Sequence, residues 1–107
     1  DPQNSINYTE DGVNWTVVEH GAFEPRLGQT CVVWNGALWM VGGRDNRRTF
    51  NDVWRSKDGL RWERVSAAAP FSPRWKHSSF VFHGRLWIAG GMDEKGFPIK
   101  DVWSYAE

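Results

Sequence analysis

The sequence of 107 residues contains little of the chemistry on which many functions depend. Its single cysteine, Cys31, leaves no disulfide within the chain. Thirteen basic and thirteen acidic residues balance, which argues against a general affinity for nucleic acid or an anionic membrane surface. No apolar run approaches the roughly 20 residues that a membrane-spanning helix needs. No segment sustains a 3.6-residue apolar period, so we expect no helix. From the charge balance and the lack of a long apolar run, we expect neither nucleic acid nor a membrane as a partner.

The sequence is rich in tryptophan, with eight residues, and their spacing follows an internal repeat. Residues 25–43 align without a gap with residues 73–91, and 8 of the 19 positions are identical. The flanking stretches match at offsets of 47 and 49 residues: 11–18 with 58–65, and 52–54 with 101–103. Six tryptophans are therefore repeat partners: Trp15 and Trp62, Trp39 and Trp87, and Trp54 and Trp103. Such regular placement indicates structural positions more than a carbohydrate-binding surface.

Each repeat consists of short strand signals separated by turn signals. Asn35-Gly36 and Asp58-Gly59 are typical two-residue hairpin turns, and His83-Gly84 stands where the second repeat needs one. We expect strands at 6–9, 15–18, 30–34, 37–41, 53–56, 62–65, 78–82, 85–89 and 102–105. The first two strands of each repeat are almost continuously apolar, which predicts burial on both faces. Four short strands in about 48 residues predict an all-β fold of β-propeller blades, each of four antiparallel strands.

The residues at these positions resemble the kelch family of propellers. The resemblance rests on the double glycines Gly42-Gly43 and Gly90-Gly91, on Trp15 and Trp62, on Pro25-Arg26 and Pro73-Arg74, and on the spacing from Arg74 to His77. The turn SKDGLRW at 56–62 is closer to a shortened Asp-box, the structural hairpin of sialidase-type propellers. Because kelch propellers include both enzymes and binding modules, the resemblance implies the fold and leaves the activity open.

The order of strands predicts one kelch-like unit, 1–107, that contains an incomplete ring. Residues 6–18 would form two strands of a split blade, 30–65 a complete blade, and 78–105 three strands of another split blade. Propellers close with about four to eight blades. Either the chain is an excerpt from a longer propeller, or copies associate head to tail, with a homotrimer of six blades favoured. In that ring, strand 15–18 of one copy would complete 78–105 of the next, and strand 6–9 would be displaced.

The long loops of a propeller with this strand order gather on one face, at 19–28, 44–51, 66–77 and 92–100. This face is basic, which suits an acidic peptide or a sugar carboxylate. The candidate ligand-binding residues are Arg26, Arg44, Arg47, Arg48, Arg74, Trp75 and His77. Arg26 and Arg74 recur with the repeat and are therefore expected to hold loop carbonyl groups, whereas the RDNRR loop and Trp75 are not repeated. Trp75 would either stack on a ligand or pack under a neighbouring loop.

Catalytic and metal-binding patterns are not apparent in the sequence. The copper oxidases that resemble kelch proteins need converging Tyr, His and Cys ligands, but Tyr8 and Tyr105 lie at opposite ends of the chain. Cys31 aligns with Ser79, which predicts a small packed residue. We expect no enzyme, metal or cofactor, and a self-assembling scaffold that binds any ligand on the loop face. The alternative is a fragment of a larger kelch propeller that binds or processes sugars of the sialic-acid or galactose type.

Overall fold

The computed structural model describes residues 26–107 in full and, before them, the backbone of residues 6–9 and 15–18. The side chain of Trp15 and most of the predicted loop 19–28 lie outside the described residues. The strands are β1 (Ile6–Thr9), β2 (Trp15–Val18), β3 (Thr30–Trp34), β4 (Ala37–Arg44), β5 (Thr49–Ser56), β6 (Glu63–Ser66), β7 (Ser78–Phe82), β8 (Arg85–Ala89) and β9 (Val102–Tyr105). Within these described ranges, no helix is long and apolar enough to cross a membrane.

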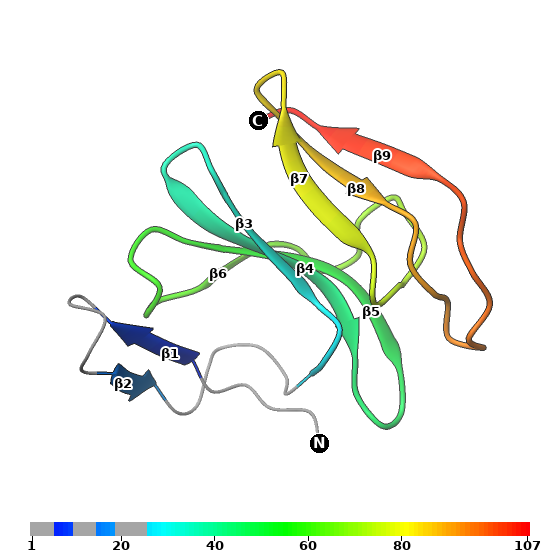
Figure 1. The fold of residues 1–107 in the computed structure, drawn as a ribbon, viewed down its shortest axis with the longest axis horizontal. Helices are drawn as coiled ribbons and strands as arrows, with labels where there is room; N and C mark the ends of the chain where they lie inside the picture. The colour runs from blue at the N-terminus through cyan, green and yellow to red at the C-terminus, as the bar shows by residue number, and fades with distance from the viewer. Residues whose placement is uncertain (1–5, 10–14, 19–25) are drawn as a thin grey trace.

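The strands form antiparallel sheets whose neighbours follow the order of the chain (Figure 1). Strands β3-β4-β5-β6 make a four-stranded sheet, β7-β8-β9 a three-stranded sheet, and β1-β2 a two-stranded one. Asn35 and Gly36 have φ angles of 50° and 71°, and His83 and Gly84 have 51° and 69°. Two successive positive φ angles are typical of the type I′ turn, so the hairpins expected at these dipeptides are confirmed.

The hairpin of β4 and β5 is longer than the sequence predicts. A bulge follows Val41, after which Gly43 pairs with Phe50 and Arg44 with Thr49. The predicted loop 44–51 therefore shrinks to 45–48, because the two strands continue their ladder beyond the bulge. The fourth strand of this sheet is displaced by one residue and runs from Glu63 to Ser66.

The main hydrophobic core lies between the four-stranded and three-stranded sheets. Its buried side chains come from both sheets and from the connection before β7: Trp34, Ala37, Trp39, Val41, Val53, Phe71, Leu86 and Ile88. On the opposite face of the four-stranded sheet, Met40 and Trp54 pack with Trp62. The first strands of the two sheets also contact each other, because the hydroxyl of Thr30 in β3 contacts that of Ser79 in β7. At the other end of β3, Trp34 Nε1 donates a hydrogen bond of 3.1 Å to the carbonyl of Gly84, in the turn after β7. This face-to-face stacking of small twisted sheets is the arrangement of adjacent propeller blades.

The prediction that the first two strands of each repeat are buried on both faces is wrong for β3 and β7. Alternate residues of β3 are exposed, with Val33 exposed at 69%, and Phe82 of β7 is exposed at 57%. Cys31 is exposed as well, which corrects the expectation of a packed residue. The physical reason is that successive side chains of a strand point to opposite faces, and only one face of β3 and of β7 is turned toward the other sheet.

Candidate functional site

Arg26 is buried and fully engaged inside the first repeat. Its guanidinium forms a bidentate ion pair with Asp52, with N–O distances of 2.6 and 3.0 Å. Nη1 also donates to the carbonyl of Gly42 at 3.0 Å, and the guanidinium carbon lies 3.9 Å from the centre of the Phe50 ring. The planar donors of arginine suit this combination of carboxylate, carbonyl and ring. Arg26 therefore fastens the loop before β3 to the bulge of β4 and the start of β5.

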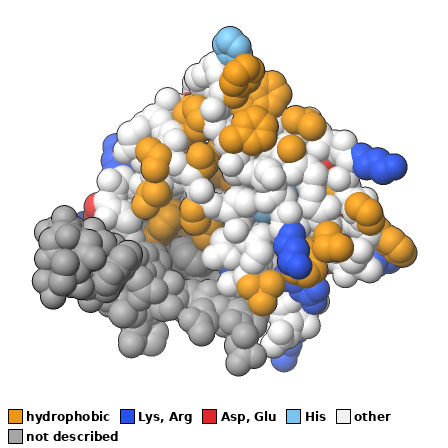
Figure 2. Space-filling view, viewed as in Figure 1, with side chains coloured by type: hydrophobic (Ala, Val, Ile, Leu, Met, Phe, Trp, Pro, Cys, Tyr) orange, Lys and Arg blue, Asp and Glu red, His pale blue; other side chains and the backbone are white. Residues whose placement is uncertain are grey.

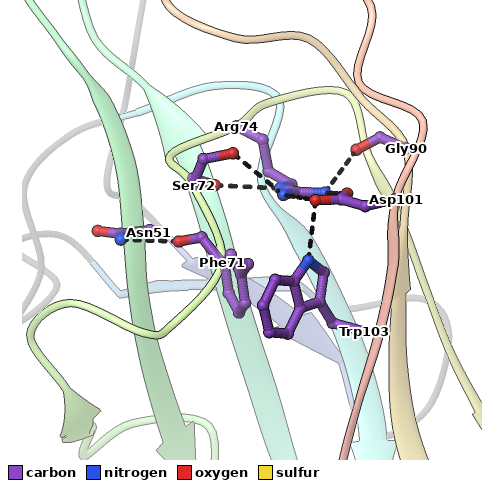
Figure 3. A network of polar contacts seen from close by, with 7 residues as sticks. All are labelled: Asn51, Phe71, Ser72, Arg74, Gly90, Asp101 and Trp103. Atoms are coloured by element: carbon purple, nitrogen blue, oxygen red, sulfur yellow. Dashed lines mark hydrogen bonds and ion pairs between the residues drawn. The ribbon is translucent and has the colours of Figure 1, made fainter.

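Arg74 repeats this arrangement in the second sheet (Figure 3). It contacts both carboxylate oxygens of Asp101, at 2.5 and 3.0 Å, and donates to the carbonyl of Gly90 at 3.1 Å. The carboxylate also accepts a hydrogen bond of 2.9 Å from Trp103 Nε1, as Asp52 does from Trp54. The hydrogen bond from Arg74 lowers the pKa of Asp101 to about 2, because it stabilises the charged carboxylate.

The acidic members of these two clusters were not recognised as functional positions in the sequence. Asp52 and Asp101 each begin a repeated Asp-Val-Trp tripeptide, so their repetition was visible. Each lies 26 or 27 residues after its arginine. The missing signal was geometric: the bulge brings the start of the third strand beside the loop before the first.

The double glycines share one conformation in both repeats. Gly42 and Gly90 have φ angles of 64° and 67°, and Gly43 and Gly91 have 104° and 98°. A Cβ on Gly42 would lie 2.8 Å from the carbonyl oxygen of Arg74, and one on Gly91 would lie 2.9 Å from that of Trp75. Only glycine satisfies both the left-handed backbone and the close approach of another chain segment.

The repeated tryptophans also make matching contacts. Trp39 Nε1 donates to the carbonyl of Trp34, and Trp87 Nε1 to that of Phe82, each at 2.9 Å.

In the turn after β5, the Ser56 hydroxyl accepts a hydrogen bond of 2.7 Å from Gly59 N. Asp58 Oδ1 accepts from the backbone N–H groups of residues 60 and 61, which lowers the pKa of Asp58. This closed set of local bonds makes the Asp-box-like turn a structural hairpin.

His77 lies between the two sheets rather than in an open ligand site. Its side chain is buried, and its Nε2 atom is 2.8 Å from the hydroxyl of Thr30, which also contacts the Ser79 hydroxyl. No hydrogen-bond partner of Nδ1 occurs within the described part of the chain. Burial, reinforced by the positive charge of Arg74, lowers the pKa of His77 to about 4. The ring is therefore neutral near pH 7.

Arg44 and Trp75 are the two candidates that the structure brings together on the loop face. The Arg44 guanidinium lies 4.8 Å from the centre of the Trp75 ring, and the Lys76 ammonium lies 5.0 Å from it. Trp75 is half-buried against the loop at Gly28, and among the described residues its Nε1 atom has no hydrogen-bond partner. The two cations beside this ring create a positive patch. Neither Arg44 nor Lys76 forms an ion pair with another residue of 26–107.

Arg47 and Arg48 lie apart from this pair, in the tight turn between β4 and β5. Asp45 Oδ1 accepts hydrogen bonds of 2.8 Å from the backbone N–H groups of both, which lowers the pKa of Asp45. Both side chains are exposed, and the Arg48 guanidinium lies 4.9 Å from the centre of the Phe50 ring. The turn thus uses its carboxylate to bind its own backbone and directs positive charge outward.

The candidate residues therefore separate by chemistry. Arg26, Arg74 and His77 are embedded in polar contacts of the fold, whereas Arg44 and Trp75, together with Lys76, form a surface that suits an anion. No group of three or more His, Cys, Asp or Glu side chains suited to a metal ion occurs in the described ranges.

Comparison with known proteins identifies the fold. No family model and no curated protein matches the chain. Among solved structures, the chain is similar to the one titled "Structure of YjhT", a kelch-repeat propeller protein, with a TM-score of 0.65 and 26% sequence identity. The match covers 77% of this chain and 25% of that one, so the chain spans about a quarter of the matched structure. The all-β fold expected from the sequence is thus confirmed, and it corresponds to part of a kelch propeller.

Proposed function

We propose that the chain is a non-catalytic propeller scaffold that associates head to tail with further copies of itself, with three copies and six blades favoured. The observation that carries this proposal is the exposure of apolar side chains on the outer face of the three-stranded sheet, the face turned away from the four-stranded sheet. Val102 there is exposed at 58%, whereas its repeat partner Val53 is exposed at 8% in the core between the sheets. Phe80 and Phe82 are exposed on the same sheet, and hydrophobic side chains gather over β7 and β8 in Figure 2.

The structure contains an internal template for the contact that would cover this face. The outer face of the four-stranded sheet, with Trp34 and Val53, packs against the inner face of the three-stranded sheet, with Leu86 and Ile88. By the repeat, the outer face of the three-stranded sheet would pack against β3 and β4 of a second copy. The face of β3 and β4 that would receive it is the inner one, turned away from the three-stranded sheet of the same chain, and it carries the exposed Val33. Each fully buried large apolar side chain contributes about 1.5–3 kcal/mol, so such faces favour association.

The mass in solution tests this proposal. Light scattering after size exclusion is expected to give about 37 kDa, three copies of 12.3 kDa. Phe82→Asp places a charge on the outer face and is expected to give single chains, whereas Phe97→Asp, on an exposed loop, is the matched control and should keep the assembly. A wild-type mass of one copy at all accessible concentrations would refute the proposal. It would favour the alternative that the blades belong to a larger kelch propeller.

A second candidate function is the binding of an anion on the loop face, as an acidic peptide or a sugar carboxylate. Arg44 and Lys76 beside the Trp75 ring support it, since arginine and aromatic groups together bind carboxylates and stack on planar or apolar ligand surfaces. Glucuronate and a short poly-glutamate peptide are suitable probes. The expected result is a fluorescence change that is lost in Trp75→Phe and weakened in Arg44→Ala, but retained in Arg47→Ala. An unchanged signal in Trp75→Phe would refute this site.

A further inference from the structure

We propose that strand β2 of a second copy pairs with the free edge of β9, and that its Trp15 side chain fills the cavity between the two larger sheets. This inference rests on the proposed self-association and specifies how it occurs. Within the described residues, β9 pairs with β8 alone, so its other edge presents unpaired backbone groups. The three-stranded sheet thus offers the position that β6 occupies in the four-stranded sheet.

The register of β2 supports its role as a fourth strand. In the complete sheet, Arg55 pairs with Glu63 and Trp54 with Arg64. In the β1-β2 sheet, Tyr8 pairs with Thr16 and Asn7 with Val17. Each of these four residues lies 47 positions before its counterpart, so β1-β2 reproduces the β5-β6 ladder.

The same repeat predicts the register on β9. Ser104 is the counterpart of Arg55, and Trp103 is that of Trp54. Ser104 of one copy is therefore expected opposite Thr16 of another, with Trp103 opposite Val17.

The cavity between the sheets is placed to receive Trp15. In the four-stranded sheet, Trp62 packs against Met40 and Trp54. The repeat partners of Met40 and Trp54 are Ile88 and Trp103, and both line the cavity. Trp15 is the partner of Trp62, so its side chain would complete the same three-residue cluster. Trp103 is exposed at 37%, whereas Trp54, covered by Trp62, is exposed at 8%.

The size and lining of the cavity suit an indole group. Its volume is about 210 Å³, and Val65, Phe71 and Tyr105 contribute to a mainly apolar wall. An apolar cavity of about 150 Å³ accepts benzene, so this one has room for the larger bicyclic ring. Trp side chains inserted in such pockets are frequent anchors of protein interfaces.

A second copy is the occupant that the geometry favours. In Figure 1, the four-stranded sheet separates β1 and β2 from β9 of the same chain. The edge of β2 that pairs with β1 cannot pair with β9 at the same time, so exchange would release β1. Strand β9 offers Trp103 where β1 offers Asn7, and pairing with β9 therefore buries more apolar surface.

Disulfide cross-linking between single-cysteine chains tests the register. Thr16→Cys and Ser104→Cys are made separately in the full chain with Cys31→Ser, since Ser79 stands at the equivalent position of the second repeat. After mixing and mild oxidation, mass spectrometry is expected to find a covalent pair containing one chain of each kind, because directly opposed residues approach disulfide distance. Val102→Cys replaces Ser104→Cys as the register control. Equal cross-linking of that control would overturn the proposed register.

Two further variants test the anchor and the competing strand. Trp15→Ala is expected to weaken self-association about thirty-fold, the typical loss of a tryptophan anchor. Tyr8→Cys with Thr16→Cys, also in the Cys31→Ser chain, locks β2 onto β1 and should prevent exchange until a reductant is added.

The outcomes also separate this proposal from the one it rests on. Assembly with no Thr16–Ser104 cross-link and no effect of Trp15→Ala would overturn strand exchange and leave face-to-face association standing. A chain that stays single at every concentration would overturn both proposals.

Discussion

The double-glycine bulge offers a sharp test of the packing between repeats, through Gly42→Ala compared with Gly36→Ala. Both glycines have left-handed backbone, with φ of 64° and 71°, so alanine costs each about 1 kcal/mol in backbone strain. A Cβ on Gly36 meets no atom within 4 Å, whereas one on Gly42 lies 2.8 Å from the Arg74 carbonyl oxygen and 2.9 Å from His77 Cε1. The overlap adds a packing cost of about 2 kcal/mol.

Gly42→Ala is therefore expected to lower the free energy of unfolding by about 3 kcal/mol, against about 1 kcal/mol for Gly36→Ala. The gain from a less flexible unfolded chain is common to both variants and cancels in the comparison. For a domain of this size, the difference of about 2 kcal/mol separates the two melting temperatures by about 10 °C. Urea and thermal unfolding at equal protein concentration measure both quantities. Equal losses in the two variants would refute the close approach of the Arg74 carbonyl to the bulge.

Three other predictions concern the polar groups of the fold. Asp52→Ala removes the carboxylate that pairs with the buried Arg26 and is expected to lower the free energy of unfolding in urea by about 3–5 kcal/mol. Asp101→Ala should lower it less, because the Asp101 side chain is 42% exposed. Equal losses in the two variants would contradict this difference in burial. Ser56→Ala removes the acceptor for Gly59 N and should cost about 1 kcal/mol, whereas no loss would mean that water replaces the bond. His77 has a folded pKa of about 4, below its unfolded value of 6.5, so the unfolded chain takes up the proton first as the pH falls. Stability should therefore fall by up to about 3 kcal/mol between pH 6.5 and 4, and a slope that survives in His77→Gln would exclude this histidine as its source. The contribution of the Asp101–Arg74 pair is lost separately, from about pH 4 down to about 2.

The strands were predictable because their signals are local or repeated. Hairpin dipeptides such as Asn35-Gly36 need a particular backbone, and the turn follows from those two residues alone. The extra length of β4 was not predictable, because it depends on a bulge at two glycines, and in a sequence glycines indicate the end of a strand rather than a bulge within it.

The candidate site was harder to predict because its contacts depend on tertiary structure. The recurrence of Arg26 and Arg74 indicated a backbone role, but their partners Asp52 and Asp101 adjoin them only after the sheet has formed. Trp75 interrupts the repeat, and this marked it as unusual. That its ring would meet Arg44, more than thirty positions earlier, depends on how two loops approach across a sheet boundary.

Among the described residues, the two arginines buried in an ion pair each have their carboxylate partner in the same repeat, Arg26 with Asp52 and Arg74 with the partly exposed Asp101. Between the larger sheets, the core is apolar and the buried polar contacts join neutral groups, such as Thr30 with His77. A duplication or loss of one repeat would therefore carry each arginine away together with its own carboxylate. No buried charge would be left unpaired at the new junction, where an isolated one costs several kcal/mol. Because each repeat contains both members of its ion pair, the number of blades can change in evolution without new charged partners in the blades that remain.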